Sequence, residues 1–291
     1  MTAKLTLKQM AAAINAIEKP FIPDTKTYAG IQEIVQRGKA ADYFNIGDTI
    51  TCPWTYSGTK YNFEWFVAHI ADVTLEDGST VPGMYLQAHY CLPFNTPFDA
   101  SESTNSDSNV QNYGSNRWKT SNLRQYLNSK GDGWYKQSTS SDSLSSSYTY
   151  LQGFMTGFED DFLNILKPVK VSTQCNTVND GGGTDVTYDT FFPPSVEQHH
   201  INPTTTYNIT RGVEGEAWDY WKKVQTSEAS YGNTYSSFMT YALNTSSACG
   251  VFLRSAYRGI SYNVARVTSN GGVGANYAYS TYRVAPACVI C

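Results

Sequence analysis

Few residues of this chain have the types and the spacing that catalysis or metal binding requires. Cys288 and Cys291 form a C-x-x-C pair, which is the spacing of redox thiols and of half a zinc site. No second cysteine pair completes such a site, and no helix follows to lower the pKa of a thiol. His199 and His200 stand beside Glu197, but adjacent residues of a strand point to opposite sides and would not share one metal ion. We therefore expect neither a metal nor a cofactor.

The acidic residues give no catalytic pair. Glu159, Asp160 and Asp161 follow one another, which is typical of the first turn of a helix, where negative side chains interact favourably with the helix dipole. The sequence contains no nucleophile elbow, no phosphate-binding loop and no H-E-x-x-H motif. We therefore predict that the protein is not an enzyme and has no catalytic residues.

The segment from Tyr257 to Tyr282 has the composition of a binding loop. Five Tyr, four Gly, three Ser and three Asn supply 15 of its 26 residues, and Asp, Glu and Lys are absent. Tyrosine offers a large, rigid contact, and Ser, Gly and Asn offer adaptable hydrogen bonding. An ordinary surface hairpin shares these residue types, and Asn270-Gly271 is a common turn between strands. Composition alone leaves both interpretations open.

Strands are expected to hold this segment. Apolar residues flank it at 251–253 and 284–290 and predict buried strands or strand ends. The alternating or apolar patterns earlier in the chain predict further strands at 49–52, 61–73 and 84–90, with a turn at 76–78.

Two helices are expected beside these strands. Ser121 is a candidate N-cap for a helix that would bury Leu123, Tyr126 and Leu127. A second helix would end before Pro168 and bury Phe154, Phe158, Phe162 and Ile165. The polar stretches at 101–109 and 137–147 are expected to form surface loops, because they are too polar to bury.

The first 43 residues predict a helical arm. One helix is expected within residues 1–20 and another at 28–39, with Ile31, Ile34 and Val35 on one side. Neither is long enough to be stable alone. The arm would serve attachment or the assembly of a homo-oligomer, or its helices would cap the core of the chain's own domain, and the sequence leaves both open.

The whole-chain composition excludes several classes of protein. The net charge of −4, with only 21 Lys and Arg, leaves no basic surface for nucleic acid. Polar residues interrupt the N-terminal apolar run, so we expect no secretory signal and no membrane insertion. Synthesis in the cytoplasm favours free thiols, and we expect buried, unpaired side chains for Cys52, Cys91, Cys175 and Cys249.

Several sequence blocks resemble a family of phage proteins. The C-terminal order FLRSAYRGISYNVARV, then SNGGVGANYAYSTYRVAPACVIC, resembles the variable region of proteins that diversity-generating retroelements target in gut-bacterial phages and prophages. Earlier blocks extend the resemblance to about residues 44–291: IGDTITCPW, GMYLQAHYCLPF, NRWKTSNLRQYLNS, GFMTGFEDDFLNILKPVKV, YDTFFPPSVEQ and EAWDYWKK. The resemblance implies an α+β, C-type lectin-like fold at 44–291 behind the N-terminal arm, similar to the formylglycine-generating sulfatase-modifying enzymes and the phage major tropism determinant.

The resemblance also implies which residues would bind a ligand. In such proteins, errors at template adenines scatter certain codons while their neighbours stay fixed. Within a variable region of about 251–291, the fixed frame would include residues 253–256, 258–259 and 285–288. The scattered, ligand-binding positions would be Tyr257, Ile260, Tyr262, Asn263, Arg266, Thr268, Gly272, Gly274, Ala275, Asn276, Tyr277, Ser280 and Tyr282. We refer to these thirteen residues as the variable positions.

The function implied is that of a hypervariable receptor-binding protein, a tail fibre or other tail-associated adhesin. Its partners would be a bacterial surface protein or glycan and, through the N-terminal arm, phage tail components. It would reside in the virion after cytoplasmic synthesis, or else in the bacterial cytoplasm or at the cell surface. The alternative is an oxidase of the formylglycine-generating type that uses Cys288 and Cys291 with copper, although the motif around those cysteines is absent here.

Two structural expectations follow for the variable region. Arg254 and Arg283 bracket it, and we expect them to bond backbone or carboxylate groups that fix it. The variable positions should form one solvent-facing patch, with Tyr277 and Tyr279 on one face and Ala278 on the other.

Overall fold

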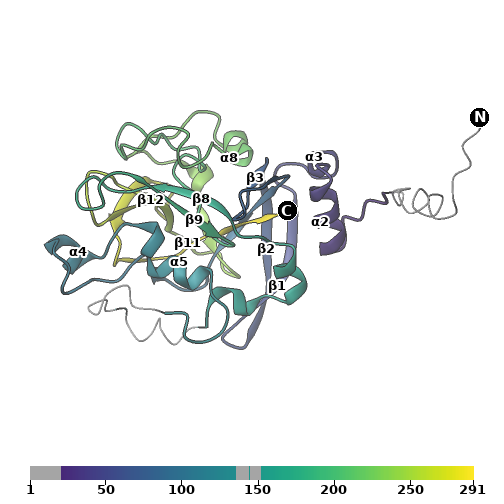
Figure 1. Cartoon of the computed structure of the whole chain (residues 1–291), viewed down its shortest axis with the longest axis horizontal. Helices are drawn as coiled ribbons and strands as arrows, with labels where there is room; N and C mark the ends of the chain where they lie inside the picture. Colours follow the sequence, from purple (N-terminus) through teal and green to yellow (C-terminus); the bar gives the residue numbers. More distant parts are fainter. Residues whose placement is uncertain (1–20, 136–143, 145–151) are drawn as a thin grey trace, which may run out of the picture.

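The computed structural model describes residues 21–135, 144 and 152–291. The helix expected within residues 1–20 and most of the polar stretch at 137–147 lie outside these residues. The described chain is a mixed α and β structure in which strands predominate and helices are few and short (Figure 1). The α+β class is therefore confirmed.

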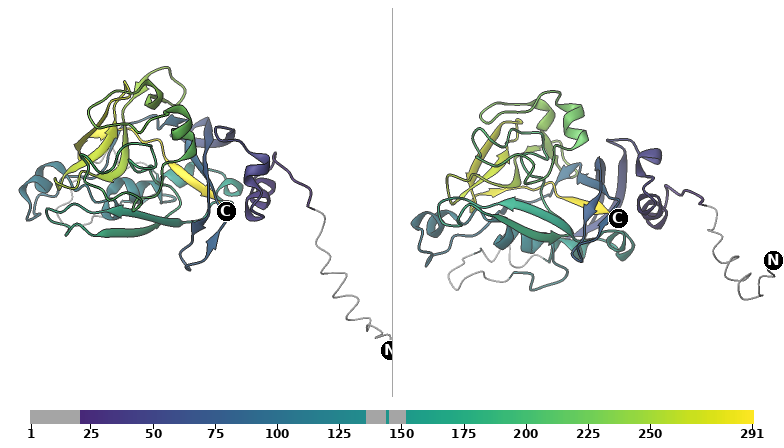
Figure 2. Two further views of the ribbon diagram at one scale, coloured as in Figure 1. Left: turned by 90° about the horizontal axis from the view of Figure 1, so that it is seen from above. Right: turned by 45° about the horizontal axis from the view of Figure 1, so that its top comes forward.

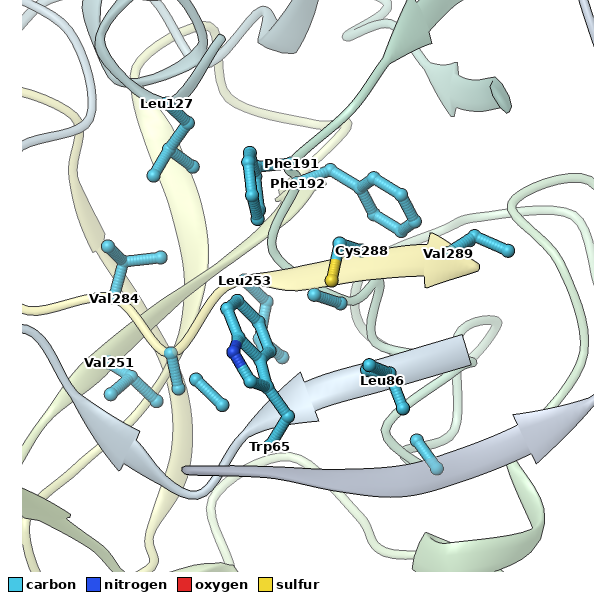
Figure 3. Close-up of a cluster of buried hydrophobic side chains, with 14 of the residues drawn as sticks. Trp65, Leu86, Leu127, Phe191, Phe192, Val251, Leu253, Val284, Cys288 and Val289 are labelled. Atoms are coloured by element: carbon cyan, nitrogen blue, oxygen red, sulfur yellow. The ribbon is translucent and has the colours of Figure 1, made fainter. Parts of the chain in front are cut away.

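A four-stranded antiparallel sheet forms one end of the molecule. Its order is β1-β2-β5-β16, and its strands are β1 (Thr49–Tyr56), β2 (Thr59–Ile70), β5 (Met84–Ala88) and β16 (Ala287–Ile290). The last strand lies beside β5, with Cys288 opposite Leu86. The side chains of β16 belong to a buried apolar cluster that also contains Trp65, Phe191 and Leu253 (Figure 3). The predicted strands at 49–52, 61–73 and 84–90 are thus confirmed, apart from shifts of a few residues at their ends.

A second, three-stranded sheet carries most of the variable region. It consists of β12 (Val251–Ala256), β13 (Asn263–Val267) and β14 (Val273–Tyr277), paired antiparallel in that order. Every residue of β12 is buried, as the apolar pattern at 251–253 predicts. The turn between β13 and β14 includes Asn270 and Gly271 as expected, and Gly271 has a φ of +82°, a conformation that favours glycine.

Short two- and three-stranded sheets complete the scaffold. A hairpin pairs β3 (Val73–Thr74) with β4 (Thr80–Val81) around the predicted turn, and another pairs β8 (Val169–Gln174) with β9 (Thr184–Asp189). Strand β10 (Thr240–Ala242) lies between β6 (Tyr90–Cys91) and β11 (Ala248–Cys249), and β7 (Thr96–Pro97) pairs with β15 (Thr281–Tyr282). Pairs such as β7 with β15 connect segments far apart in sequence.

The predicted helix after Ser121 is confirmed. Helix α5 (Asn122–Leu127) begins where the Ser121 hydroxyl accepts a hydrogen bond from the Arg124 amide at 3.2 Å. Its buried face includes the expected Leu123, Tyr126 and Leu127. The polar stretch at 101–109 is not a loop throughout, because α4 (Ser108–Tyr113) begins inside it, capped by Asp107.

The second predicted helix is two short helices. A 3-10 turn, η2 (Phe154–Gly157), is separated from α7 (Asp160–Asn164) by Phe158 in an extended conformation. A Cβ atom at Gly157 would lie 2.2 Å from the Trp54 indole nitrogen, so this close packing restricts the segment between the two helices. The four apolar side chains of the prediction are nevertheless all buried, and Asp160 and Asp161 occupy the first turn of α7 as expected.

The remaining helices are short. Helix α8 (Asp219–Val224) packs on β2, and two further 3-10 turns are η1 (Trp118–Thr120) and η3 (Ser236–Phe238). In the N-terminal region lie α2 (Tyr28–Gln36) and α3 (Ala40–Tyr43).

Helix α2 packs against the rest of the described chain. It buries Ile31, Ile34 and Val35 as predicted, although it ends at Gln36. The Gln32 side chain donates to the Cys291 carbonyl at 3.0 Å, and the Tyr28 ring lies 5.4 Å from that of Phe162. Helix α2 therefore contributes to the core beside β16. It lies at one end of the molecule, whereas α4 and β12 lie toward the other end (Figures 1 and 2).

The expectation of four unpaired cysteines is wrong for one pair. Cys91 of β6 and Cys249 of β11 form a disulfide, with their sulfur atoms 1.88 Å apart. The two cysteines are 158 positions apart in the sequence, and only the pairing of both β6 and β11 with β10 brings them together. Cys52 and Cys175 are free and buried, as expected.

Candidate ligand-binding surface

The variable positions share one property, which is that all of them are at least partly accessible. None of the thirteen is buried: Tyr277 is exposed, and the other twelve are half-buried. Buried residues alternate with them along the same segment, namely Ser261, Val264, Ala265, Val267, Gly271, Val273 and Ala278. The positions expected to vary therefore lie outside the core. Of the frame residues expected to stay fixed, those at 253–256 and 285–288 are buried, whereas 258–259 are not.

One group of tyrosines surrounds Tyr113. The Tyr113 ring, at the end of α4, lies 4.4 Å from that of Tyr277, 5.1 Å from that of Tyr262 and 5.7 Å from that of Tyr279, centroid to centroid. We call these four residues the Tyr113 cluster. Tyr277 and Tyr279 are exposed and Ala278 between them is fully buried, which agrees with the predicted alternation. Tyr113 comes from outside the C-terminal segment, so helix α4 also contributes to this surface.

A second group forms around Tyr257. Its ring lies 6.2 Å from those of Tyr207 and Tyr231, which are themselves 5.5 Å apart. Tyr207 is fully buried and donates through its hydroxyl to the Gly274 carbonyl at 2.8 Å. Tyr231 is 40% exposed. Tyr257 therefore stands between a buried tyrosine that supports β14 and one that faces solvent.

Tyr282 belongs to a third group. Its hydroxyl accepts from the Asn276 side-chain amide at 2.8 Å, and the Arg266 guanidinium lies over its ring at 5.2 Å. The same ring also packs on buried Phe252, with centroids 5.0 Å apart. The structure thus brings Tyr262 and Tyr277 together, but it places Tyr257 and Tyr282 in separate groups. The expectation of one solvent-facing patch is therefore wrong for these tyrosines.

The other variable positions lie on β13, β14 and the adjoining turns. In the two strands, Asn263 is opposite Tyr277 and Arg266 is opposite Gly274, while Ala275 is opposite the buried Ala265. Thr268 and Gly272 are in the β-turn, where the Gly272 amide donates to the Thr268 hydroxyl at 2.7 Å. Ile260 and Ser280 each close a turn, through amides that donate to the carbonyls of Tyr257 and Tyr277.

A buried asparagine that the sequence analysis did not single out holds the turn between β12 and β13. The Asn116 side-chain amide donates to the carbonyl oxygens of Ile260 at 2.6 Å and Asn263 at 2.9 Å. Its backbone amide donates to the carbonyl oxygen of Ser261 at 3.1 Å. Asn116 is fully buried. These bonds reach only main-chain oxygens, so they do not depend on which side chains occupy Ile260 and Asn263.

Arg258, which lies in the same turn, connects it to neighbouring segments of the chain. Its guanidinium donates to the carbonyls of Cys175 at 2.9 Å, Asn208 at 2.6 Å and Gly182 at 2.6 Å. The Ser261 hydroxyl bonds the carboxylate of Asp107, and this hydrogen bond is the main reason that the pKa of Asp107 is lowered. Contacts with several other segments of the chain thus hold the backbone of the turn.

Both bracketing arginines bond backbone carbonyls, as predicted. The Arg254 guanidinium donates to the main-chain carbonyl oxygens of Pro193 at 3.1 Å and Glu214 at 2.6 Å. The Arg283 guanidinium donates to the main-chain carbonyl oxygen of Leu92 at 3.0 Å. Arg254 is almost completely buried, and this burial lowers its pKa to about 10. The two residues connect the ends of the variable region to the scaffold.

Comparison with known proteins gives a family for this chain. Residues 85–291 match the model of a family described as a domain of unknown function, DUF6273. The chain belongs to this family. No curated protein and no solved structure matches it. The DUF6273 region begins within β5 and extends through β16, so it contains the whole candidate surface, whereas β1, β2 and α2 precede it.

The cysteines of the C-x-x-C pair lie inside the DUF6273 region and away from solvent. Cys288 is fully buried and Cys291 is 4% exposed. Burial raises the pKa of Cys291 to about 11 and that of Cys288 well above its usual range. Both thiols are therefore protonated near neutral pH, which makes them poor nucleophiles and poor metal ligands.

The histidine pair also lies apart from any ligand-binding arrangement. The His199 ring packs 3.8 Å from Trp221 and 4.8 Å from Phe238, and burial lowers its pKa to about 3. The Glu197 carboxylate instead accepts the Gly212 amide at 2.8 Å. In the described part of the DUF6273 chain, no three His, Cys, Asp or Glu side chains group to hold a metal ion. Within the same residues, no helix has the length and hydrophobicity needed to span a bilayer.

Proposed function

We propose that this DUF6273 protein is a hypervariable ligand-binding protein, a receptor-binding or tail-associated adhesin of a phage or prophage. Its C-terminal face would bind a protein or glycan on a bacterial surface, and a retroelement would diversify it. The fold would be of the C-type lectin type, with the N-terminal arm serving attachment to the tail or the assembly of a homo-oligomer.

One observation carries the proposal. None of the thirteen positions that resemble scattered codons is buried, whereas the frame residues at 253–256 and 285–288 are all buried. Side chains that are replaced repeatedly cannot carry the core, because large losses of stability come mainly from changes at buried positions.

The main-chain contacts support the same proposal. Asn116 and Arg258 hold the turn through carbonyl oxygens alone, so the turn keeps its shape whatever side chains it displays. A preformed backbone reduces the ordering cost of binding. Monomeric proteins rarely display grouped aromatic side chains such as the Tyr113 cluster without a use for them.

The position of the surface suits an adhesin. Helix α2, to which residues 1–20 connect, lies at one end of the molecule, and α4 with its Tyr113 lies toward the other (Figure 1). A protein attached through its N-terminal arm would therefore present the candidate surface outward.

The enzymatic alternative receives less support. An oxidase of the formylglycine-generating type would need Cys288 or Cys291 accessible to a peptide and to copper, and both thiols are buried. A copper-binding assay combined with a peptide oxidation assay would distinguish the two functions, and activity that is lost in Cys291→Ser would favour the oxidase.

Binding to intact gut bacteria tests the proposal directly. Wild-type protein should bind some strains in a panel, and the double variant Tyr262→Ser with Tyr277→Ser should lose that binding, because tyrosines are frequent hot spots of interfaces. The matched control is Tyr241→Ser, which changes a tyrosine of similar exposure, 40%, on β10. Equal loss in both variants, or no loss in the double variant, would count against the proposed surface.

A further inference from the structure

A separate cavity lies between β3, β5, β8 and β12. Its volume is about 250 Å³, and its lining includes Arg254, Tyr85, Lys170, Ser172 and Glu214. Sites for drug-sized ligands begin at roughly 300 Å³, so this cavity would admit a smaller molecule. None of the variable positions lines it.

The buried guanidinium in its wall has no direct counter-ion. Arg254 is 1% exposed, and its terminal nitrogens donate to the carbonyls of Pro193 and Glu214 and to the Gln198 side-chain amide oxygen. All three acceptors are neutral. Its Nε atom is buried and has no hydrogen-bond partner among the described residues. Burying a charge without pairing it is costly, so this arrangement favours an additional anion.

Glu214 does not fill that role by contact. It is the acidic residue whose charge acts most strongly on Arg254, but it meets Arg254 through its main-chain oxygen. Its carboxylate accepts instead from the Gln174 amide at 2.8 Å and from the Ser255 hydroxyl. No described carboxylate forms an ion pair with the Arg254 side chain.

We propose that this cavity binds a small monoanionic carboxylate, whose charge compensates the buried guanidinium of Arg254. Lys170 adds a second positive charge to the lining, and Tyr85 and Ser172 add hydroxyl groups that can donate hydrogen bonds. Asp72 and Glu214 also line the cavity, so a dianion such as phosphate would be repelled more strongly than a monoanion.

Nitrogen NMR of the full-length protein tests the proposal, with acetate as the probe. The ¹⁵N-labelled chain is titrated with sodium acetate and, separately, with sodium chloride at equal ionic strength. Acetate should shift the Nε–H resonance of Arg254 in a saturable way, and chloride should not. The resonance of Arg37, which is paired with Glu33 on α2, is the internal reference and should stay unchanged in both titrations.

Two further results would decide against the site. Absence of a shift with acetate, or an equal shift with chloride, would show that no carboxylate site exists, and a larger shift with inorganic phosphate would contradict the class of ligand. The variant Ser172→Phe should occupy the cavity and abolish the acetate response while retaining Arg254. If this variant folds and responds like the wild type, acetate binds elsewhere; if it does not fold, the wild-type titration remains decisive.

Discussion

The Tyr113 ring of α4 stacks on the Tyr277 ring of β14, with centroids 4.4 Å apart and planes inclined by 25°. A residue outside the C-terminal segment therefore packs directly on the most exposed of the variable positions. A ligand that contacts Tyr277 would also meet Tyr113, so recognition would combine a fixed and a variable contact.

Replacement of Tyr113 by Ala should reduce binding to every bacterial strain that the wild type recognises. The loss should reach about 2 kcal/mol if Tyr113 is a hot spot. Cell-binding isotherms of wild type, Tyr113→Ala and the exposed control Tyr241→Ala provide the measurement. Binding by Tyr113→Ala that matches the control would place the ligand away from the Tyr113 cluster.

The tyrosines of the variable region should differ in their effect on stability. Tyr277→Ser should change the free energy of unfolding by no more than about 0.5 kcal/mol, because its side chain is exposed. Tyr282→Ser should cost about 1 to 3 kcal/mol, because it removes the packing on Phe252 and the hydrogen bond with Asn276. Urea denaturation of the two variants measures both values, and equal losses would mean that the contacts of Tyr282 with Phe252 and Asn276 do not stabilise the fold.

Asn116→Ala should destabilise the protein by about 1 to 3 kcal/mol. It removes the Asn116 donor from the Ile260 carbonyl and one of two donors from the Asn263 carbonyl, which also accepts from the Tyr257 amide. Asn112→Ala on the exposed side of α4 is the control, since its amide bonds only the Ser108 carbonyl within that helix. Similar melting temperatures for Asn116→Ala and the wild type would show that other contacts hold the turn.

His199 should make the fold sensitive to acid. Its pKa is about 3 in the folded protein and near 6.5 in an unfolded chain, so the unfolded state binds more protons between these values. The stability contributed by neutral His199 is present above pH 6.5 and is lost as the pH falls toward 3. Between pH 7 and pH 5 this amounts to about 2 kcal/mol.

A variant that cannot titrate isolates this contribution. His199→Phe keeps an aromatic ring against Trp221 and Phe238, and its stability should decline less between pH 7 and pH 5 than that of the wild type. His89→Phe changes an exposed histidine and serves as the control. An unchanged pH dependence in His199→Phe would assign the acid sensitivity to other groups.

Local patterns in the sequence were sufficient for many elements of the fold. The apolar runs predicted β12 and β16, and Ser121 predicted the start of α5, because burial and capping are read from neighbouring residues. The second helix divides where Gly157 packs closely on Trp54, and the disulfide forms where β6 and β11 both pair with β10. Such contacts join distant segments and leave no local pattern.

The candidate site shows the same limit. The composition of the C-terminal segment pointed to the exposed tyrosines, and the placement of Arg254 and Arg283 pointed to their bonds with the scaffold. Tyr207 bonds this segment across 67 positions of sequence and Asn116 across 144, and Tyr113 is farther still from its partner Tyr277. An asparagine or tyrosine in those places resembles any other polar or aromatic residue until the chain is folded.

The central claim is that the variable positions are exchangeable and select the ligand. A library that randomises these thirteen positions, displayed on cells and sorted separately for folding and for binding to different bacterial strains, tests it most directly. Most clones should fold, and clones selected on different strains should differ at the variable positions. A library that is largely unfolded, or selected clones that bind the same strains regardless of sequence there, would contradict it.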